Sequence, residues 1–171
     1  IDALHDCGIR RVVMMTGDNA KTAQSIAQQV GVDDFHAEVL PEDKAAYIQK
    51  ARAEGHTVMM VGDGVNDSPA LSEADVGISV STGAAIAREI ADVTISADDL
   101  YEIATLKRLS DAMVRRINKN YHMIVGINTG LILLGVAGVF QPTMSALLHN
   151  TSTILISLKS MENLLDTGTK L

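Results

Sequence analysis

The sequence predicts an α/β fold: a parallel, Rossmann-like sheet with flanking helices, followed by a hairpin of two membrane-spanning helices. Three observations predict it. Short apolar runs alternate with segments of helical periodicity over residues 9–95, the pattern of βαβ units. One of these runs, Val58–Val61, leads directly into an acidic loop, Gly62–Asp67. After residue 120 the charged residues nearly disappear, as in segments that lie in lipid.

Size and composition set the outer limits. The 171 residues leave room for one domain with an appendage. The net charge of −7 argues against nucleic acid as a partner. The four charged residues after position 120 cancel one another, so residues 1–120 carry this whole charge. The single Cys7 excludes an internal disulfide, and the opening on Ile1 without an initiator methionine is expected of part of a longer protein.

Residues 9–15 predict a short buried strand that ends at Thr16. A segment of helical periodicity follows and stops at Gly31. Either Asp18 or Asn19 is placed to cap this helix. At the carboxyl end of the strand, the Thr16 hydroxyl and nearby amides are placed to bind a phosphate oxygen. The alternative is a simple turn followed by a helix cap.

A second strand is expected at Phe35–Val39, and the next helix begins at Pro41 and ends at Gly55. Lys44 lies in the first turn of this helix, where a cation opposes the helix dipole. That arrangement is easier to accept if the ammonium group reaches a phosphate. The alternative is a solvated surface lysine.

The central strand, Thr57–Val61, delivers Asp63, Asn66 and Asp67 to its carboxyl end, where ligands of parallel sheets bind. Carboxylates at such a place suit Mg²⁺, which then holds a phosphate. The alternative is a turn that merely separates strand from helix. The remaining elements expected of this part are a helix from Ser68, a strand at Val76–Val80, a helix at Ala84–Ile90 and a strand at Val93–Ile95.

The second part is expected to be helical and to lie in a lipid bilayer. The predicted boundaries are 1–97 for the α/β domain, 98–120 for a linking helix, 121–165 for two membrane helices broken at Gln141-Pro142, and 166–171 for a tail. Basic residues before the first span place residues 1–120 in the cytoplasm, and Gly126 with Gly130 suits close helix packing. The alternative, a buried pair of core helices, needs more covering chain than this domain offers. We therefore expect an integral protein of the plasma (inner) membrane.

Several motifs together carry a resemblance to a known family. They are Met15–Asn19, Pro41–Lys44, Gly62–Asp67 with Pro69–Leu71, and Ala91-Asp92. In this order they resemble the P-type ATPases, whose phosphorylation domain has the haloacid dehalogenase fold. The resemblance covers nearly the whole chain and implies ATP and Mg²⁺ as cofactors.

The resemblance also implies roles for individual residues. Thr16 would contact an acyl phosphate, and Lys44 would neutralise its charge. Asp63 would ligate Mg²⁺, while Asn66 and Asp67 would order the phosphate and the surroundings of the metal, with Asp67 as a further metal-site residue. The chemistry implied is phosphoryl transfer.

Gly17 and Asp18 would lie near ATP on the same resemblance. The family's phosphorylated aspartate lies in an Asp-Lys-Thr-Gly-Thr motif, which this sequence does not contain. We therefore expect the C-terminal part of an ATP-driven pump, unable to form the phosphoenzyme alone. Two alternatives stay open: a soluble phosphatase of the same fold, and a non-catalytic, membrane-anchored truncated pump.

The transported ion is expected to be a heavy or transition-metal cation, because two spans close behind the phosphorylation domain resemble the heavy-metal branch. The segment His149–Thr153 resembles the His-Glu-Gly-Ser/Gly-Thr element of the cobalt-type subgroup, with Asn and Thr at its second and third positions. The transport-path candidates are His149, Asn150, Ser152 and Thr153. Their nitrogen and oxygen donors favour a divalent ion, with Cu⁺ left open. For His149, as for Asn128, a hydrogen bond between helices is the alternative.

Overall fold

The computed structural model describes residues 1–62, 65–80, 89–95 and 100–164. The chain divides into two units, Ile1–Thr105 and Leu106–Leu171. The helix expected at residues 84–90 falls largely outside the described residues, and so does Asp63. The first unit is the α/β part, and the second holds most of one long helix and the helix that follows it.

The strands of the first unit are short and all their described pairings are parallel, as predicted. They form two sheets rather than one: β1 pairs with β2, and β4 lies between β3 and β5. The strands are β1 Val13–Met15, β2 Asp34–His36, β3 Met59–Gly62, β4 Val76–Val80 and β5 Val93–Ile95. Among the described residues, β1 and β3 therefore each have an edge without a partner strand.

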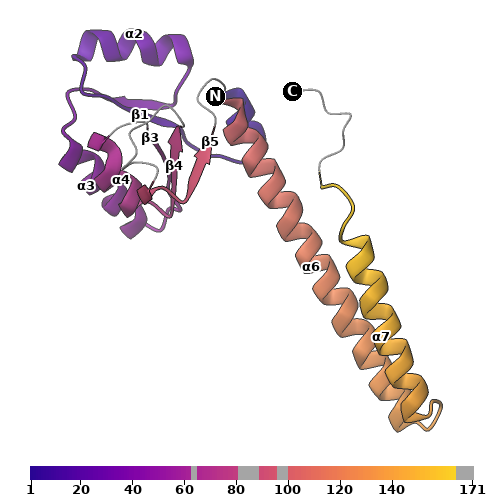
Figure 1. Cartoon of the computed structure of the whole chain (residues 1–171). Helices are drawn as coiled ribbons and strands as arrows, with labels where there is room; N and C mark the ends of the chain where they lie inside the picture. The colour runs from indigo at the N-terminus through magenta and orange to yellow at the C-terminus, as the bar shows by residue number, and fades with distance from the viewer. Residues whose placement is uncertain (63–64, 81–88, 96–99, 165–171) are drawn as a thin grey trace. The chain divides into compact units, whose positions relative to one another are not determined.

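Helices pack against these strands. In Figure 1, α2 lies apart from α3 and α4, which pack together on the other side of the strands. The helices of this unit are α1 Asp2–Asp6, α2 Ala20–Val30, α3 Pro41–Ala53 and α4 Ser68–Glu73, with a single 3₁₀ turn, η1, at Val65–Asp67. The first of these was not expected from the sequence.

The ends of α2 follow from local chemistry. Asn19, rather than Asp18, caps the helix: its side-chain oxygen accepts a hydrogen bond from the Thr22 amide at 3.0 Å. Gly31 ends the helix with a φ of 78°, in the left-handed region that glycine adopts without a steric penalty. The predicted stop at Gly31 is confirmed.

The core of the first unit lies where α3 and α4 meet the β3–β5 sheet. Ile48, Leu71 and Ile78 are its largest apolar side chains, each 1% exposed or less. Helix α4 approaches β4 so closely that a Cβ at Gly77 would lie 2.8 Å from the Leu71 carbonyl oxygen. Glycine is therefore required there for helix and strand to pack.

In the second unit one helix runs through the predicted boundary at residue 120. The expected linking helix and first span are one continuous helix, α6 Tyr101–Val136, because no proline lies between them to end it. The predicted break at Gln141-Pro142 is confirmed, with Pro142 opening α7, Pro142–Lys159. A Cβ added at Gly126 or Gly130 would have no atom within 4 Å, so the described residues do not make the close helix contact that these glycines suit.

Polar contacts join α6 to the α7 segment at its C-terminal end. The Arg116 guanidinium donates to the carbonyl oxygens of Ser160 and Asn163, each at 3.1 Å, and to that of Glu162. The Asn120 amide donates to the Ser160 hydroxyl at 2.6 Å. In the described parts of the chain, no helix combines the length and the apolar character needed to cross a membrane.

Candidate functional site

Lys44 and Asp67 form the best-defined charge pair of the first unit. Lys44 Nζ donates to Asp67 Oδ1 at 2.7 Å, and the two side chains are 15% and 12% exposed. The pair joins the first turn of α3 to the end of η1. A charge pair withdrawn from water this far is held together mainly because either partner alone would be costly to bury. Of the residues predicted for the site, the structure brings these two together.

This pair explains why a lysine lies in the first turn of α3. The Lys44 ammonium group binds a carboxylate on η1. This carboxylate offsets the unfavourable interaction of the cation with the positive end of its own helix dipole. The ammonium group has three donors, one of which Asp67 takes. The solvated-lysine alternative is therefore wrong, because Lys44 is mostly buried.

Gly62 explains how Asp67 is positioned. A Cβ added at Gly62 would lie 2.7 Å from the Asp67 Cβ and 3.0 Å from its Oδ2. Because such distances are shorter than real Cβ contacts, the carboxyl end of β3 must be glycine for the Asp67 side chain to fold over it. The residue as a whole is 8% exposed, so the strand end and the carboxylate are one packed unit.

Thr16 lies in a loop that closes on itself. Its hydroxyl donates to Asp18 Oδ2 at 2.8 Å, and the Asp18 amide donates back to the hydroxyl oxygen at 3.2 Å. The backbone is tied to the segment after β2, because the Thr16 amide donates to the His36 carbonyl and the Val39 amide donates to the Thr16 carbonyl, both at 3.0 Å. The loop thus has a fixed backbone, while its Gly17 is exposed.

The acidic loop after β3 is the Mg²⁺ site that the sequence predicts. Asp63 lies outside the described residues, and Asn66 is exposed within η1. The described parts of the chain contain no group of three or more His, Cys, Asp or Glu that could hold a metal. They do offer the Asp67 carboxylate, with Oδ1 bound to Lys44. Since Mg²⁺ is usually held by one or two carboxylates with the remaining positions filled by water, this donor fits such an ion.

Two buried polar atoms were not anticipated from the sequence. The Ser68 hydroxyl, next to Asp67, and His36 Nε2 have no hydrogen-bond partner in the part of the chain that the structure describes. Buried polar groups without a partner are rare, and each has a cause such as strain, a catalytic role or a bound water or ion. For the Ser68 hydroxyl, the only indication in the sequence is that this serine directly follows the acidic motif.

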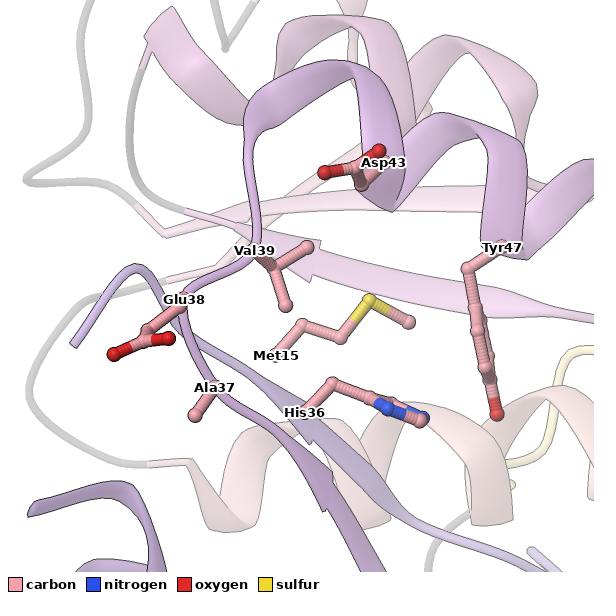
Figure 2. A pocket seen from close by; sticks show the side chains of 7 residues that line it. All are labelled: Met15, His36, Ala37, Glu38, Val39, Asp43 and Tyr47. Atoms are coloured by element: carbon pink, nitrogen blue, oxygen red, sulfur yellow. The ribbon is translucent and has the colours of Figure 1, made fainter. Parts of the chain in front are cut away.

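His36 lines a small cavity, together with Met15 and Asp43. Met15 and Asp43 directly precede Thr16 and Lys44 in the sequence. Figure 2 shows the His36 ring facing Tyr47, with ring centroids 4.9 Å apart. The cavity measures about 250 Å³ and is lined by Met15, His36, Ala37, Glu38, Val39, Asp43 and Tyr47. Its lining comes from three separate chain segments, so no local sequence motif predicts the cavity.

A further ion pair lies at the other end of the β1–β2 sheet. The Arg11 guanidinium donates to the Asp34 carboxylate. This hydrogen bond, with a second from the Phe35 amide, lowers the pKa of Asp34 below its usual value. The same contact raises the pKa of Arg11. Both groups are exposed to solvent, so the pair belongs to the surface and not to the site.

In the second unit, His149 makes the principal contact among the predicted transport residues. Its Nδ1 lies 2.7 Å from Asn128 Oδ1 on α6. The Ser152 and Thr153 hydroxyls donate to the His149 carbonyl oxygen at 2.8 and 3.0 Å. Asn150 is exposed. The structure thus groups three of the four predicted residues and adds Asn128, the weaker candidate.

Comparison with known proteins bears on both units. The family model for haloacid dehalogenase-like hydrolases matches residues 1–75. A manganese-exporting P-type ATPase of Mycobacterium tuberculosis is 42% identical over 150 residues, 87% of this chain. A copper-exporting P-type ATPase of Staphylococcus saprophyticus is 44% identical over 156 residues, 91% of this chain. The chain belongs to the heavy-metal P-type ATPases.

A solved structure extends the match to three dimensions. A zinc-transporting PIB-type ATPase, crystallised in its E2.Pi state, superposes with a TM-score of 0.87 at 29% identity over 94% of this chain. The chain spans about a fifth of the P-type ATPases it matches, 21% of the manganese exporter and 20% of the copper exporter. The predicted family is therefore confirmed, as is the haloacid dehalogenase-like parallel fold of its first part.

Proposed function

We propose that this chain is part of an ATP-driven, Mg²⁺-dependent pump for transition-metal cations that works through an aspartyl phosphate. The observation that carries the proposal is the Lys44–Asp67 pair at the carboxyl end of β3. Phosphoryl transfer needs little covalent chemistry from the protein and much charge neutralisation at fixed positions. A mostly buried ammonium group, fixed by a carboxylate, provides such a position.

Lys44 would neutralise the phosphoryl group with the donors that Asp67 leaves free. Asp63 and Asp67 would hold Mg²⁺, which when bound supplies positive charge against the phosphoryl oxygens. Asn66, exposed beside them, would hydrogen-bond the phosphate. Each of these roles needs its side chain at the strand end, and Gly62 is the residue that makes room for Asp67 there.

Thr16 would bind a phosphate oxygen through its hydroxyl. To do so it must exchange the hydrogen bond that it donates to Asp18, at 2.8 Å, for one to the phosphate. That exchange makes the loop responsive to phosphate. Gly17 and Asp18, both exposed, would lie near ATP.

The phosphorylated aspartate would come from a further strand of the complete pump. Among the described residues β1, β2, β3 and β5 each have one edge without a partner strand, and of these β1 and β3 are the two that lead into the loops of Thr16 and Asp67. Since backbone donors and acceptors at a sheet edge are ready to pair, these edges are suited to receive it. Thr16, at the end of β1, and Asp67, just after β3, would then lie on either side of the nucleophile.

We propose that α6 and α7 lie in the membrane because their surface is rich in exposed apolar side chains. Large apolar side chains on α6 and α7 are 58–84% exposed; they are Ile132, Leu133, Val136, Leu147, Ile154, Leu155 and Leu158. Apolar surface on this scale needs a covering, and lipid provides one. Basic residues on the N-terminal half of α6 would then keep residues 1–120 in the cytoplasm. Neither helix, over its described residues, combines the length and the apolar character needed to cross a membrane, so insertion needs a separate test. The complete protein should stay in the membrane pellet after alkaline carbonate extraction. Its release into the supernatant would contradict membrane insertion.

The transported cation would pass His149, with Asn150, Ser152 and Thr153 as neighbouring donors. Imidazole and oxygen donors favour divalent ions such as Mn²⁺, Zn²⁺ or Co²⁺ over Cu⁺. The test is ATP hydrolysis by the complete protein, titrated separately with each divalent ion and with Cu⁺. We expect stimulation by at least one divalent ion. A rate that none of the metals changes would refute the transport function.

A further inference from the structure

A hydrogen bond between α6 and α7 involves the transport-path candidate His149. His149 Nδ1, on α7, lies 2.7 Å from Asn128 Oδ1, on α6. The two residues are 21 positions apart, and each lies well inside its helix. Because the contact joins two helices, it fixes the imidazole against both.

The chemistry of the two groups determines where the ring proton lies. An amide oxygen can only accept a hydrogen bond, so His149 Nδ1 must carry the proton and donate it. A neutral imidazole has one N–H and one lone pair, so the lone pair is left on Nε2. Nε2 has no hydrogen-bond partner among the residues that the structure describes, and the His149 side chain is exposed on the hairpin.

The neighbouring hydroxyls do not compete for that lone pair. Ser152 and Thr153 both donate to the His149 carbonyl oxygen, so their protons are turned to the backbone of α7. No Asp, Glu, Lys or Arg occurs in the sequence between Lys119 and Lys159. The imidazole therefore has no nearby charged side chain on α7 or the facing part of α6 to bind it.

We propose that Asn128 is a positioning residue that holds His149 in the tautomer whose Nε2 binds the transported divalent cation. The inference rests on the proposed transport function and deepens it by assigning the ligand atom and the residue that selects it. Metal-binding histidines commonly donate their other ring N–H to an oxygen acceptor, which fixes the tautomer and orients the ring. Here that acceptor is a side-chain amide from the partner helix.

The test uses the complete pump and two substitutions of opposite effect at one position. Asn128→Asp keeps an oxygen acceptor for Nδ1–H, whereas Asn128→Leu removes it at similar size. We expect Asn128→Leu to raise the half-activating concentration of Zn²⁺ or Mn²⁺ about 10–100-fold, with the maximal rate retained. Asn128→Asp should restore the wild-type concentration. Asn118→Leu, an exposed asparagine of the same helix, is the matched control and should change nothing.

The second readout is the ¹⁵N NMR spectrum of the His149 ring in the metal-free pump, assigned by difference from His149→Gln. Wild type and Asn128→Asp should show the Nδ1–H tautomer, and Asn128→Leu a mixture of both. If Asn128 did not select the tautomer, the ring would show the same mixture in all three proteins.

Three results would overturn the inference. One is a wild-type metal response in Asn128→Leu while His149→Ala abolishes it. Another is an Asn128→Asp variant weaker than Asn128→Leu, because the amide would then be the donor. The third is an Nε2–H tautomer in the wild type. If no metal stimulates even the wild type, the transport function fails instead, and the NMR spectrum still decides the tautomer.

Discussion

Removing the Lys44 ammonium group separates its structural contribution from the catalytic one that we propose. In Lys44→Met the side chain keeps most of its length and loses its charge, so Asp67, 8% exposed, is left without its partner. Asp67→Asn leaves Lys44 in the converse state. The double variant removes both charges and restores electrical neutrality at the strand end. Lys50→Met, an exposed lysine of the same helix, is the control.

The geometry sets the expected size of these effects. Breaking a buried pair by removing one partner costs about 3–5 kcal/mol, and the lower end applies here because the two side chains remain 15% and 12% exposed. Removal of both charges from such a site is close to neutral. Each single variant should therefore lose about 3 kcal/mol of local stability, and the double variant much less than the sum.

Catalysis should follow a different pattern. If Lys44 stabilises charge on the transferred phosphoryl group, its loss lowers the rate of phosphoenzyme formation about 10²–10³-fold. The double variant should not recover that rate, although it recovers stability. Local stability thus reports on the ion pair, and the rate of phosphoenzyme formation reports on the ammonium group.

Both quantities can be measured on the complete protein. Hydrogen–deuterium exchange in peptides of α3 and η1 reports the local opening free energy, and phosphate transfer from labelled ATP reports the chemistry. Unchanged exchange in Lys44→Met would show that the pair does not hold the strand end together. Phosphorylation of Lys44→Met at the wild-type rate would refute its role at the phosphate.

Three further predictions concern stability. Gly62→Ala should cost about 1–3 kcal/mol and slow phosphorylation, because its Cβ displaces Asp67; unchanged thermal unfolding and phosphorylation would refute this. Arg116→Met should speed hydrogen exchange just after α7, where Arg116 binds the Ser160 and Asn163 carbonyls, by lowering the local opening free energy by about 2 kcal/mol; Arg116→Lys should lower it less. Arg11 depresses the pKa of Asp34, so the pair stabilises the fold above the unfolded-state pKa and that contribution fades as pH falls through the folded value. The melting temperatures of wild type and Asp34→Asn should therefore differ most near neutral pH and converge in acid; a difference independent of pH would contradict it.

The sequence predicted the strands and the strand-end residues because these depend on local pattern. Apolar runs, glycine stops and Pro41 and Pro142 at helix starts act within a few residues, and the structure confirms them. The choice between Asp18 and Asn19 as helix cap could not be predicted, since both residue types cap helices equally well. In the structure Asn19 caps the helix, while the Asp18 carboxylate accepts a hydrogen bond from the Thr16 hydroxyl.

Contacts between distant segments lay beyond local pattern. The ring contact of His36 with Tyr47 depends on how α3 packs against β2, and the Asn128–His149 hydrogen bond depends on the rotation of two helices about their axes. The length of α6 was missed for another reason. A change from charged to apolar residues near position 120 looks like a boundary, but a helix continues through it when no residue breaks the backbone pattern.

The most direct test of the central claim is phosphate transfer from labelled ATP to the complete protein, with and without Mg²⁺ and the activating metal. We predict a phosphoprotein that requires Mg²⁺, responds to the transition metal and is released by hydroxylamine, as an acyl phosphate is. The same labelling should be absent in Asp63→Ala. Absence of any labelled wild-type protein, or normal Mg²⁺-dependent labelling of Asp63→Ala, would contradict the proposed phosphoryl-transfer site.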